Sequence, residues 1–465
     1  MRKSLMIGAA LSAVVVAGLI TVPVTMAGAG TPPTVLYVSN VAPLATAPGT
    51  SCSHPGYATI QSAINAAAPA ATIHICASLS PYVEQLTITQ PVSLTTTGPA
   101  TVQLPASPVN SSTTCDNAIG TAGYQQPQDE ISICGAGTVN ITGLTVSAYW
   151  PAGTCYDSLY GVFVGSGSNL VSNGLTVNGA GVPIGDSAVG CQGGVAIQVG
   201  SARPSPNEKG KATLTNTTVS GYQKNGITTT GTGSSMTVTT ATVTGRGPVG
   251  TAENGIEVAY GAKGIISGAT VSNNQCNIAP PVCGPDAQND QYQATGVLFY
   301  GAKAGSSLSG SKITHNDIGV YYGSAAASEP LSPEVTISNN NFKSNLDEQI
   351  QLDQGVASIV NNKLHVTGNV GIQVLQYSGQ TYAPASTASN DTISGQGIGV
   401  QVYSDLCTIP PYNGGGPVPG CVAGSAPGDD LPGTFNINNS SFLATNTLAE
   451  QDNSLNFFIM GSGNI

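Results

Sequence analysis

The sequence predicts an all-β protein whose chain winds as a single-stranded parallel β-helix of about ten or more coils, capped by a short N-terminal helix. A short motif, usually a glycine followed by alternating apolar residues, starts at residues 161, 194, 226, 255, 296, 319, 349, 371 and 399, so successive copies lie 22 to 41 residues apart. Most of these intervals are too short for a βαβ unit, but each accommodates three short strands and their turns. Repeats of this length are typical of a solenoid.

Two mostly apolar columns are the second observation. They occupy the positions one and three residues after the start of each motif, and these positions share one face of a strand because side chains alternate. We expect both columns to point inward, with roughly 1.5–3 kcal/mol from each buried aliphatic side chain. The first column is Val162, Val195, Ile227, Ile256, Val297, Val320, Ile350, Ile372 and Val400, and the second is Val164, Ile197, Thr229, Val258, Phe299, Tyr322, Leu352, Val374 and Val402.

Residues 57–68 predict the capping helix. Ile60, Ala63, Ile64 and Ala67 recur at helical spacing on one face, and Pro69 ends the pattern. A helix here can cover the first coil of the solenoid, which would otherwise expose core side chains and strand edges. One strand is expected before the helix, at residues 35–38.

The N-terminus has the layout of a signal peptide. Arg2 and Lys3 precede an apolar stretch that ends near Val22, and small residues follow up to Ala29. We expect cleavage after Ala29, which leaves no membrane span, and an uncleaved anchor is the alternative. The chain then divides into a signal peptide (1–29), a lead-in (30–55) and the β-helix domain (56–465). The mature protein is expected to be secreted, extracellular or associated with the cell wall.

Ten cysteines fit an exported protein, because disulfides persist outside the cytosol. Their pairing does not follow from the sequence. Each bridge would contribute roughly 2–4 kcal/mol. The chain has no Cys-x-x-Cys pair and only four histidines, which argues against a Cys/His metal site. Pairing between neighbours would join Cys52 with Cys76, Cys115 with Cys134, Cys155 with Cys191, Cys276 with Cys283 and Cys407 with Cys421.

Charge is scarce in this chain. Charged residues make up 8% of it, against about 25% in an ordinary domain. Without Arg2 and Lys3 the chain carries 10 basic and 23 acidic residues, a net charge of −13. Nucleic acid is therefore a poor candidate partner, because phosphate binding requires a basic face.

Two stretches resemble a known superfamily. The first stretch resembles the cap and first coil of the pectin-lyase-like superfamily, especially of pectinesterases. It consists of Gly56-Tyr-Ala-Thr-Ile-Gln-Ser-Ala-Ile-Asn-Ala-Ala67, followed by Thr72-Ile-His-Ile75 and Tyr82-Val-Glu84. Ser338-Asn-Asn-Asn-Phe342 and Val360-Asn-Asn-Lys-Leu364 resemble the Asn-rich coils of the right-handed β-helix repeat family, which includes copper-cluster maturation proteins and alginate epimerases. The resemblance covers about residues 56–460 and implies a right-handed single-stranded parallel β-helix.

The catalytic motifs of these families are absent. The chain lacks the Asp-Phe-Ile-Phe-Gly-like strand and the Gly-Arg-Pro-Trp motif of pectinesterases, the Gly-His-Gly and Arg-Ile-Lys motifs of polygalacturonases, and the Tyr-Gly-Phe-Asp-Pro-His-Asp motif of alginate epimerases. Its only tryptophan is Trp150, before Pro151. The resemblance therefore implies a fold and assigns no catalytic residue.

The outward positions of the motif strands form a candidate binding face. Tyrosines and amides repeated at the strand spacing of about 4.8 Å suit an extended sugar chain, which stacks on rings and hydrogen-bonds to amides. Insertions beside these strands would wall the face. The alternative is an ordinary solvated face with stacked Gln and Tyr side chains. The expected outward column is Phe163, Ala196, Thr228, Glu257, Leu298, Tyr321, Gln351, Gln373 and Gln401, and the candidate substrate-binding residues are Glu257, Tyr300, Gln351, Asp353, Gln373, Gln401 and Tyr403.

The best candidate for chemistry is a pair of aspartates. Asp317 and Asp347 both lie two residues before a motif start, so they should stack one coil apart, about 5 Å. Like charges at this distance raise one pKa or bind a cation such as calcium. Tyr321 completes the candidate catalytic set, and no other cofactor is indicated. Aspartates that merely cap turns are the alternative.

These observations favour an exported β-helix protein that binds extracellular or cell-wall polysaccharide. If it is an enzyme, the fold resemblance suggests a polysaccharide lyase, esterase, epimerase or hydrolase. A non-catalytic structural or adhesive surface protein is the alternative, favoured by the low charge and the missing motifs. The sequence indicates no oligomeric state.

Overall fold

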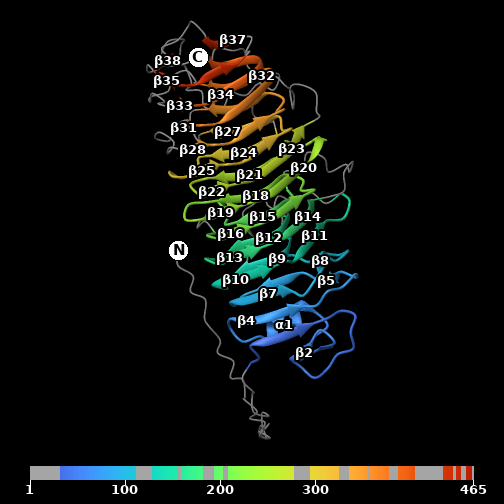
Figure 1. The fold of residues 1–465 in the computed structure, drawn as a ribbon. Helices are drawn as coiled ribbons and strands as arrows, with labels where there is room; N and C mark the ends of the chain where they lie inside the picture. The colour runs from blue at the N-terminus through green and yellow to red at the C-terminus, as the bar shows by residue number, and fades with distance from the viewer. Residues whose placement is uncertain are drawn as a thin grey trace, which may run out of the picture. The chain divides into compact units, whose positions relative to one another are not determined.

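The computed structural model describes residues 32–111, 128–153, 159–181, 193–202, 208–276, 294–323, 335–353, 356–375, 386–403, 433–443, 447–451 and 457–462. These residues form a parallel β-helix in which three rows of strands repeat from coil to coil, and Figure 1 shows the strands stacked in chain order from blue to red. The expected signal peptide, residues 1–29, lies outside the described residues. None of the helical structure in the described ranges is long and apolar enough to cross a membrane.

Row 1 is a parallel sheet of 14 strands, which agrees with the expected number of coils. Strands that pair in this sheet are mostly three strands apart in chain order, because each coil contributes one strand to every row. The strands are β1 (Val35–Val38), β4 (Ala71–Ile75), β7 (Val92–Thr96), β10 (Thr138–Thr142), β13 (Asn169–Asn173), β16 (Lys211–Thr215), β19 (Ser235–Thr239), β22 (Lys263–Ser267), β25 (Ser307–Ser309), β28 (Val335–Ser338), β31 (Ala357–Val360), β33 (Thr387–Ser389), β35 (Gly433–Asn438) and β38 (Phe457–Ser462).

Rows 2 and 3 form one 22-stranded sheet, because β32 (Lys363–Leu375) and β34 (Thr392–Tyr403) each run through both rows. The other strands of row 2 are β5 (Tyr82–Val83), β8 (Thr101–Gln103), β11 (Thr145–Tyr149), β14 (Thr176–Gly181), β17 (Thr218–Ser220), β20 (Thr242–Val249), β23 (Thr270–Cys276), β26 (Lys312–Thr314), β29 (Asn341–Lys343) and β36 (Ser441–Leu443). The other strands of row 3 are β6 (Leu86–Ile88), β9 (Gln128–Cys134), β12 (Leu159–Gly165), β15 (Val195–Val199), β18 (Asn225–Thr230), β21 (Asn254–Ala259), β24 (Thr295–Tyr300), β27 (Ile318–Gly323), β30 (Glu348–Asp353) and β37 (Thr447–Gln451).

Both predicted inward columns line the core of row 3 in all their coils but one. Ile256 and Val258, for example, are 0% exposed. One coil was aligned wrongly: Val162 pairs with Ile197, while Val195 pairs with Tyr160. The error is a shift of two residues, because Ala196 and not Gly194 occupies the first position of the motif in this coil. Ile197 and Val199 take the two inward positions, and Val195 packs with Tyr160 and Phe163 outside the main core.

The corner between rows 1 and 2 has the same backbone in most coils. Its first residue has a positive φ, a conformation that Gly and Asn tolerate best, as at Gly143 (72°) and Asn361 (58°). Its second residue is buried in every coil, and its chemistry changes along the solenoid. These buried residues are, in order, Leu144, Leu175, Thr217, Ala241, Ala269, Ser311, Asn340, Asn362, Asp391 and Ser440.

In the later coils this corner holds a hydrogen-bonded ladder. The Oδ1 atom of Asn362 accepts from the backbone N–H of Asn340 at 2.9 Å and from its Nδ2 at 3.0 Å. The Oδ1 atom of Asp391 accepts from the same two groups of Asn362 at 2.7 and 3.0 Å. A second ladder, Asn274, Asn316 and Asn345, occupies the corner between rows 2 and 3.

The predicted helix caps the first coil as α1 (Ile60–Ala66), and its apolar face is buried. The Thr59 side chain accepts a hydrogen bond from the Ser62 N–H at 3.2 Å. The carboxylate of Glu84 accepts from the N–H groups of Ile60 and Gln61 at 2.7 and 2.9 Å, which satisfies two more free donors of the first turn. The expected strand at residues 35–38 is β1, and it pairs with β4.

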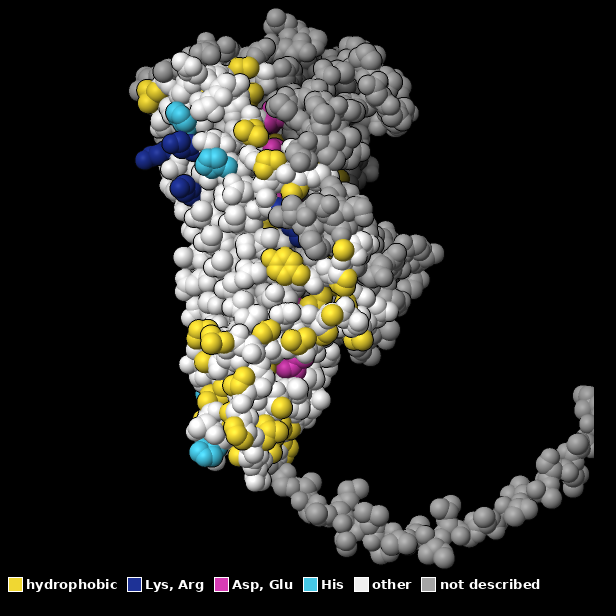
Figure 2. Space-filling model, turned by 90° about the vertical axis from the view of Figure 1, so that its right-hand side faces the viewer, with side chains coloured by type: hydrophobic (Ala, Val, Ile, Leu, Met, Phe, Trp, Pro, Cys, Tyr) yellow, Lys and Arg dark blue, Asp and Glu magenta, His cyan; other side chains and the backbone are white. Residues whose placement is uncertain are grey.

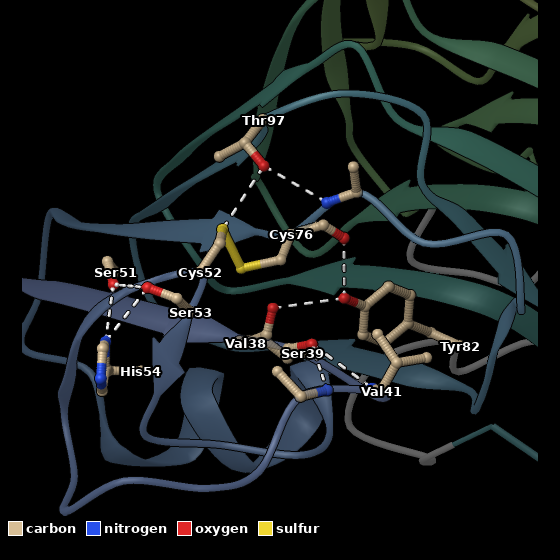
Figure 3. The surroundings of a disulfide bond; sticks show 12 residues. Val38, Ser39, Val41, Ser51, Cys52, Ser53, His54, Cys76, Tyr82 and Thr97 are labelled. Atoms are coloured by element: carbon tan, nitrogen blue, oxygen red, sulfur yellow. Dashed lines mark hydrogen bonds between the residues drawn. A yellow bond between two sulfur atoms is a disulfide. The ribbon is translucent and has the colours of Figure 1, made fainter.

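A disulfide bond between Cys52 and Cys76 staples the cap, as expected (Figure 3). It joins the short antiparallel pair β2 (Gly49–Ser51) and β3 (His54–Pro55) to the end of β4. Beside it, the Tyr82 hydroxyl lies 2.9 Å from the carbonyl oxygen of Cys76. Cys134 and Cys276 are also disulfide-bonded, but the cysteines expected to pair with them lie outside the described residues, as do both members of the other two pairs.

Candidate functional site: an open stretch on row 3

Row 3 carries the outward column that the sequence indicated as a binding face. Strand pairing places Gln198, and not Ala196, in this column, because of the two-residue shift in β15. The expectation for Ala196 was therefore wrong. The column observed in the structure is Phe163, Gln198, Thr228, Glu257, Leu298, Tyr321, Gln351, Gln373 and Gln401.

Three consecutive members of this column are accessible to solvent. Glu257 on β21, Leu298 on β24 and Tyr321 on β27 are half-buried. Thr228, in the coil before them, is 2% exposed, and Gln351, in the coil after them, is 0% exposed. We call Glu257, Leu298 and Tyr321 the open stretch. At the usual strand spacing it extends for about 10 Å along the solenoid.

Two tyrosines border the open stretch. Tyr300 is half-buried and lies two residues after Leu298 on β24, so both side chains leave the same face of the strand. Tyr260 is 48% exposed, and its ring meets that of Tyr300 edge-on, with 5.6 Å between the ring centroids. Exposed rings next to polar groups provide a surface on which a sugar ring can stack.

Tyr321 is held by a carboxylate in the next coil. Its hydroxyl donates to Oδ2 of Asp353 at 2.6 Å, a short distance typical of a charge-assisted hydrogen bond. Asp353 is 9% exposed, so the carboxylate lies behind the accessible phenol. The structure thus joins two candidates that the sequence analysis had assigned to different roles.

Glu257 stands beside a lysine that the sequence analysis had not singled out. Its Oε2 accepts a hydrogen bond from Nδ2 of Asn225, in the preceding coil. Burial raises the pKa of the Glu257 carboxyl, and the positive charge of Lys224 lowers it again. Burial also lowers the pKa of Lys224, whose Nζ donates to the carbonyl of Ala252 at 2.7 Å. An acid with a raised pKa therefore faces an amine with a lowered one.

Asp317 and Asp347 lie in adjacent coils, as expected, with the Asp347 N–H donating to the Asp317 carbonyl at 2.9 Å. The Oδ2 atom of Asp317 accepts from the backbone N–H groups of Cys276 and Ala294 at 2.9 and 3.2 Å. The pKa of Asp317 is raised to about 6. Burial is the main cause, the charge of Asp347 adds to the rise, and the two N–H groups oppose it. Asp317 therefore also joins the backbones of neighbouring coils.

The position two residues before the motif start holds two further charged residues, Lys224 and Glu253, which the sequence analysis missed. Backbone hydrogen bonds align Lys224 and Glu253 with Asp317 and Asp347, and all four lie two residues before a motif start. Glu253 is 0% exposed, and its Oε2 accepts from the Arg246 N–H at 2.9 Å. Burial raises its pKa well above the usual range, while Arg246 and Lys224 lower it. The sequence could have indicated Lys224 and Glu253, because each lies two residues before the glycine that starts a motif, Gly226 or Gly255.

Other expected binding residues lie outside the open stretch. Gln351 and Gln373 are 0% exposed and Gln401 is 5% exposed, so these amides do not form the solvated face that was the alternative. The Nε2 atom of Gln373 donates to Oε1 of Gln401 at 3.0 Å. The backbone of Tyr403 pairs with Leu375 in β32, and its side chain is outside the described part of the structure.

The described residues include no group of three or more His, Cys, Asp or Glu side chains arranged to hold a metal ion. The open stretch and the residues beside it combine groups suited to proton transfer and to stacking. Glu257 and Lys224 are a candidate acid and base, Tyr321 is a phenol donor polarised by Asp353, and Tyr300 supplies a ring.

Comparisons with known proteins agree with this architecture. Residues 205–393 match the family described as "Right handed beta helix region". No curated protein sequence matches the chain. The expected resemblance to right-handed β-helix proteins is thereby confirmed at the level of the repeat.

Several solved structures are similar at low sequence identity. One is a double mutant of the periplasmic alginate epimerase AlgG, with 10% identity, a TM-score of 0.44, and coverage of 84% of this chain and 77% of that one. The A-module of Azotobacter vinelandii mannuronan C-5 epimerase AlgE6 has 15% identity and a TM-score of 0.42, covering 87% and 93%. The catalytic domain of a GH87 α-1,3-glucanase in complex with nigerose has 12% identity and a TM-score of 0.47, covering 94% and 70%.

Proposed function

Starting from a chain that is a right-handed parallel β-helix protein, we propose that it is exported and binds an extended polysaccharide across the open stretch of row 3. The observation that carries this proposal is the change in burial along one column. The same outward position is covered in the coils on either side and accessible at Glu257, Leu298 and Tyr321. An extended sugar chain lying there would stack on Tyr300 and hydrogen-bond to Glu257 and Tyr321.

We further propose that the open stretch supports acid–base chemistry on the bound chain. Tyr321 would donate a proton, with Asp353 orienting the phenol, since their hydrogen bond is 2.6 Å long. Glu257 and Lys224 would exchange a second proton. Asp317 and Asp347 flank this site and would keep it electronegative, with Asp317 changing charge near pH 6. A lyase, an epimerase, an esterase or a hydrolase can each be built from such groups.

The test is to incubate the secreted protein with pectins, alginates, glycosaminoglycans and wall glycans, with and without calcium, and to analyse products by mass spectrometry. Unsaturated fragments identify a lyase, saturated fragments a hydrolase, and loss of methyl or acetyl groups an esterase. Proton exchange from deuterated solvent detects an epimerase, which leaves the mass of the polymer otherwise unchanged. Affinity electrophoresis in the same glycans measures binding without turnover.

Two variants connect any signal to the open stretch. We expect Tyr300→Ala to weaken binding about tenfold through the lost ring, and Tyr321→Phe to weaken it by up to about tenfold through the lost hydroxyl. Tyr149→Phe is the matched control, because Tyr149 is 52% exposed on β11 of row 2. Equal effects at Tyr149 and Tyr321 would contradict the site. Binding without products would support the structural or adhesive alternative, and no binding to any glycan would refute the proposal.

A further inference from the structure

Basic residues occupy one part of this chain. All 10 lysines and arginines that follow Lys3 lie within residues 203–363. Three of them, Lys312, Lys343 and Lys363, fall on consecutive strands of row 2, namely β26, β29 and β32. His315 and His365, two of the four histidines in the chain, lie on or next to the same strands. We call these five residues the lysine patch.

The strand pattern forces the lysine patch outward. On β29 the buried residue is Phe342, at 0% exposure, and on β32 it is Leu364, at 1%, so the residues on either side must leave the opposite face. All three lysines are exposed, His315 is exposed and His365 is half-buried. Figure 2 shows Lys and His side chains gathered on a face that is otherwise mostly uncharged.

Pairing fixes how the charges are spaced. Lys312 and Lys363 share one column with Asn341 between them, so they are two strands, or about 10 Å, apart. Lys343 occupies the next outward column, beside His365. The three lysines therefore leave the sheet from the corners of a triangle, with Asn341 between Lys312 and Lys363 and with Ser394 paired with His365.

No carboxylate of the described residues forms an ion pair with the three lysines, although Asp347 is half-buried four positions after Lys343. The outward positions of β23, β26, β29, β32 and β34 in row 2 carry Thr, Ser, Asn, Lys and His side chains near the patch. None of the three lysines makes an ion pair with a described residue. The carboxylates of Asp317 and Asp391, at the two corners of row 2, are buried at 7% and 1% exposure. A cluster of unpaired cations thus persists on a chain whose net charge is −11.

We propose that the lysine patch is a second binding surface, for the acidic groups of an anionic polysaccharide. Three cations whose backbone positions are fixed by the sheet can contact several carboxylates or sulfates of one extended chain, and their combined field attracts it. Nucleic acid fits poorly, because it engages long basic faces and the rest of this chain is acidic. The choice of a polysaccharide rests on the proposed function, whereas the location does not, because the patch lies on row 2 and the open stretch on row 3.

The test compares two triple variants of the full secreted protein. Lys312→Gln, Lys343→Gln and Lys363→Gln remove the patch, while Lys209→Gln, Lys211→Gln and Lys263→Gln make the same change in net charge on and beside row 1. Binding to polygalacturonate and to a neutral glucan is measured at two salt concentrations. We expect the patch variant to lose about tenfold or more in affinity for the polyuronate, together with most of the salt dependence, and the row 1 variant to keep both. Lys→Arg at the three patch positions should retain binding.

Each result has a defined meaning. Equal losses in the two triple variants would reduce the effect to net charge, and no loss in the patch variant would refute the surface. If the patch variant loses binding to DNA or to anionic vesicles but not to polyuronate, the occupant is a different polyanion and the proposal fails. Tyr321→Phe separates the two proposals, because it should weaken glycan binding at the open stretch and leave the lysine-dependent, salt-sensitive component intact. Thermal melting verifies that every variant is folded.

Discussion

The corner between rows 1 and 2 is filled by leucine in the early coils and by amides in the later ones. Leu144 and Leu175 are 0% exposed, and Asn340 and Asn362 are 2% and 1% exposed at the equivalent position. The residue before each has a positive φ, so the backbone is the same in both regions. The backbone therefore sets the shape of the corner, and two different kinds of interaction fill it.

The two fillings differ in how they connect neighbouring coils. A buried leucine is stabilised by dispersion contacts with all the atoms around it and by its removal from water. It therefore tolerates small changes in any one of those atoms. Asn362 makes its hydrogen bonds with specific groups, namely the N–H and Nδ2 of Asn340, the Ile337 carbonyl and Oδ1 of Asp391. The later coils are thus joined by directional bonds that fail if one member is lost.

The largest effect is expected from Asn362→Ala. It removes four hydrogen bonds and leaves buried groups of Asn340 and Asp391 with fewer partners. We expect a loss of about 3–5 kcal/mol in the free energy of unfolding, measured by denaturant titration. Asn362→Leu should be nearly as harmful, although leucine is the native residue at the equivalent position 175.

Two controls accompany this prediction. Leu175→Ala should cost about 2–5 kcal/mol, whereas Asn140→Ala on exposed β10 should change the free energy of unfolding by no more than about 0.5 kcal/mol. If Asn362→Leu is as stable as the native protein, the directional account of the later coils is incorrect.

A smaller effect comes from the acid in the amide ladder. Asn340 and Asn362 each donate an Nδ2 hydrogen to a row 1 carbonyl, of Leu308 and Ile337 respectively. Asp391 has no such hydrogen when it is ionised, and burial raises its pKa to about 6. Because the folded pKa exceeds the usual value, the folded state binds the proton more tightly, and the associated stability is lost as the pH rises through about 6.

Asp391→Asn should therefore remove this pH dependence. Above pH 7 we expect the variant to be more stable than the native protein by up to about 3 kcal/mol, and near pH 4 we expect little difference. Thermal melts across this pH range measure the effect. A variant that is less stable at every pH would show that the carboxylate, and not an amide, is the required group at this position.

A further prediction concerns a buried acid in the early coils. Glu130 on β9 is 0% exposed, and neither carboxyl oxygen accepts a well-aligned hydrogen bond from a described residue. Burial raises its pKa well above the usual range, while the nearby backbone of Ser147 lowers it. Its contribution to stability is therefore present at low pH and is lost as the pH rises through the raised pKa.

Glu130→Gln should accordingly raise the melting temperature at alkaline pH and have little effect at acidic pH. Glu84→Gln is the contrasting variant, because the Glu84 carboxylate accepts two helix N–H groups and its loss should destabilise the cap. A destabilised Glu130→Gln protein at alkaline pH would mean that this carboxylate is bound to a partner in solution.

The fold was predictable because every coil uses the same inward positions. Ile256 and Val258 are buried as expected, and so are their equivalents from Val297 to Val402. The register of β15 was not predictable, since Ala196 occupies the first motif position in this coil and Gly194, two residues earlier, was taken for it. Local patterns also say nothing about what covers a face, which is why the burial of Gln373 was not foreseen.

The candidate site was predicted only in part. Asp317 and Asp347 were found because both precede a motif start by two residues, and the same rule applied to Gly226 and Gly255 finds Lys224 and Glu253. The lysine patch could be recognised only from the strand pairing, because Lys312 and Lys363 are 51 positions apart in the chain and are brought near each other by β29. The negative net charge of the chain gives no indication of this surface.

The amide ladder also determines how such a chain can grow. Asn340 and Asn362 are 22 residues apart, and each occupies the same place in its coil. A gene duplication that inserted one more copy of this 22-residue unit would supply the new amide together with the acceptor and donor that it needs. Extra residues in a loop lengthen a coil without displacing its corner residue, as the 29 positions between Asn362 and Asp391 show. Selection can therefore lengthen the later part of the solenoid in whole coils, while the surfaces on its outside diversify independently.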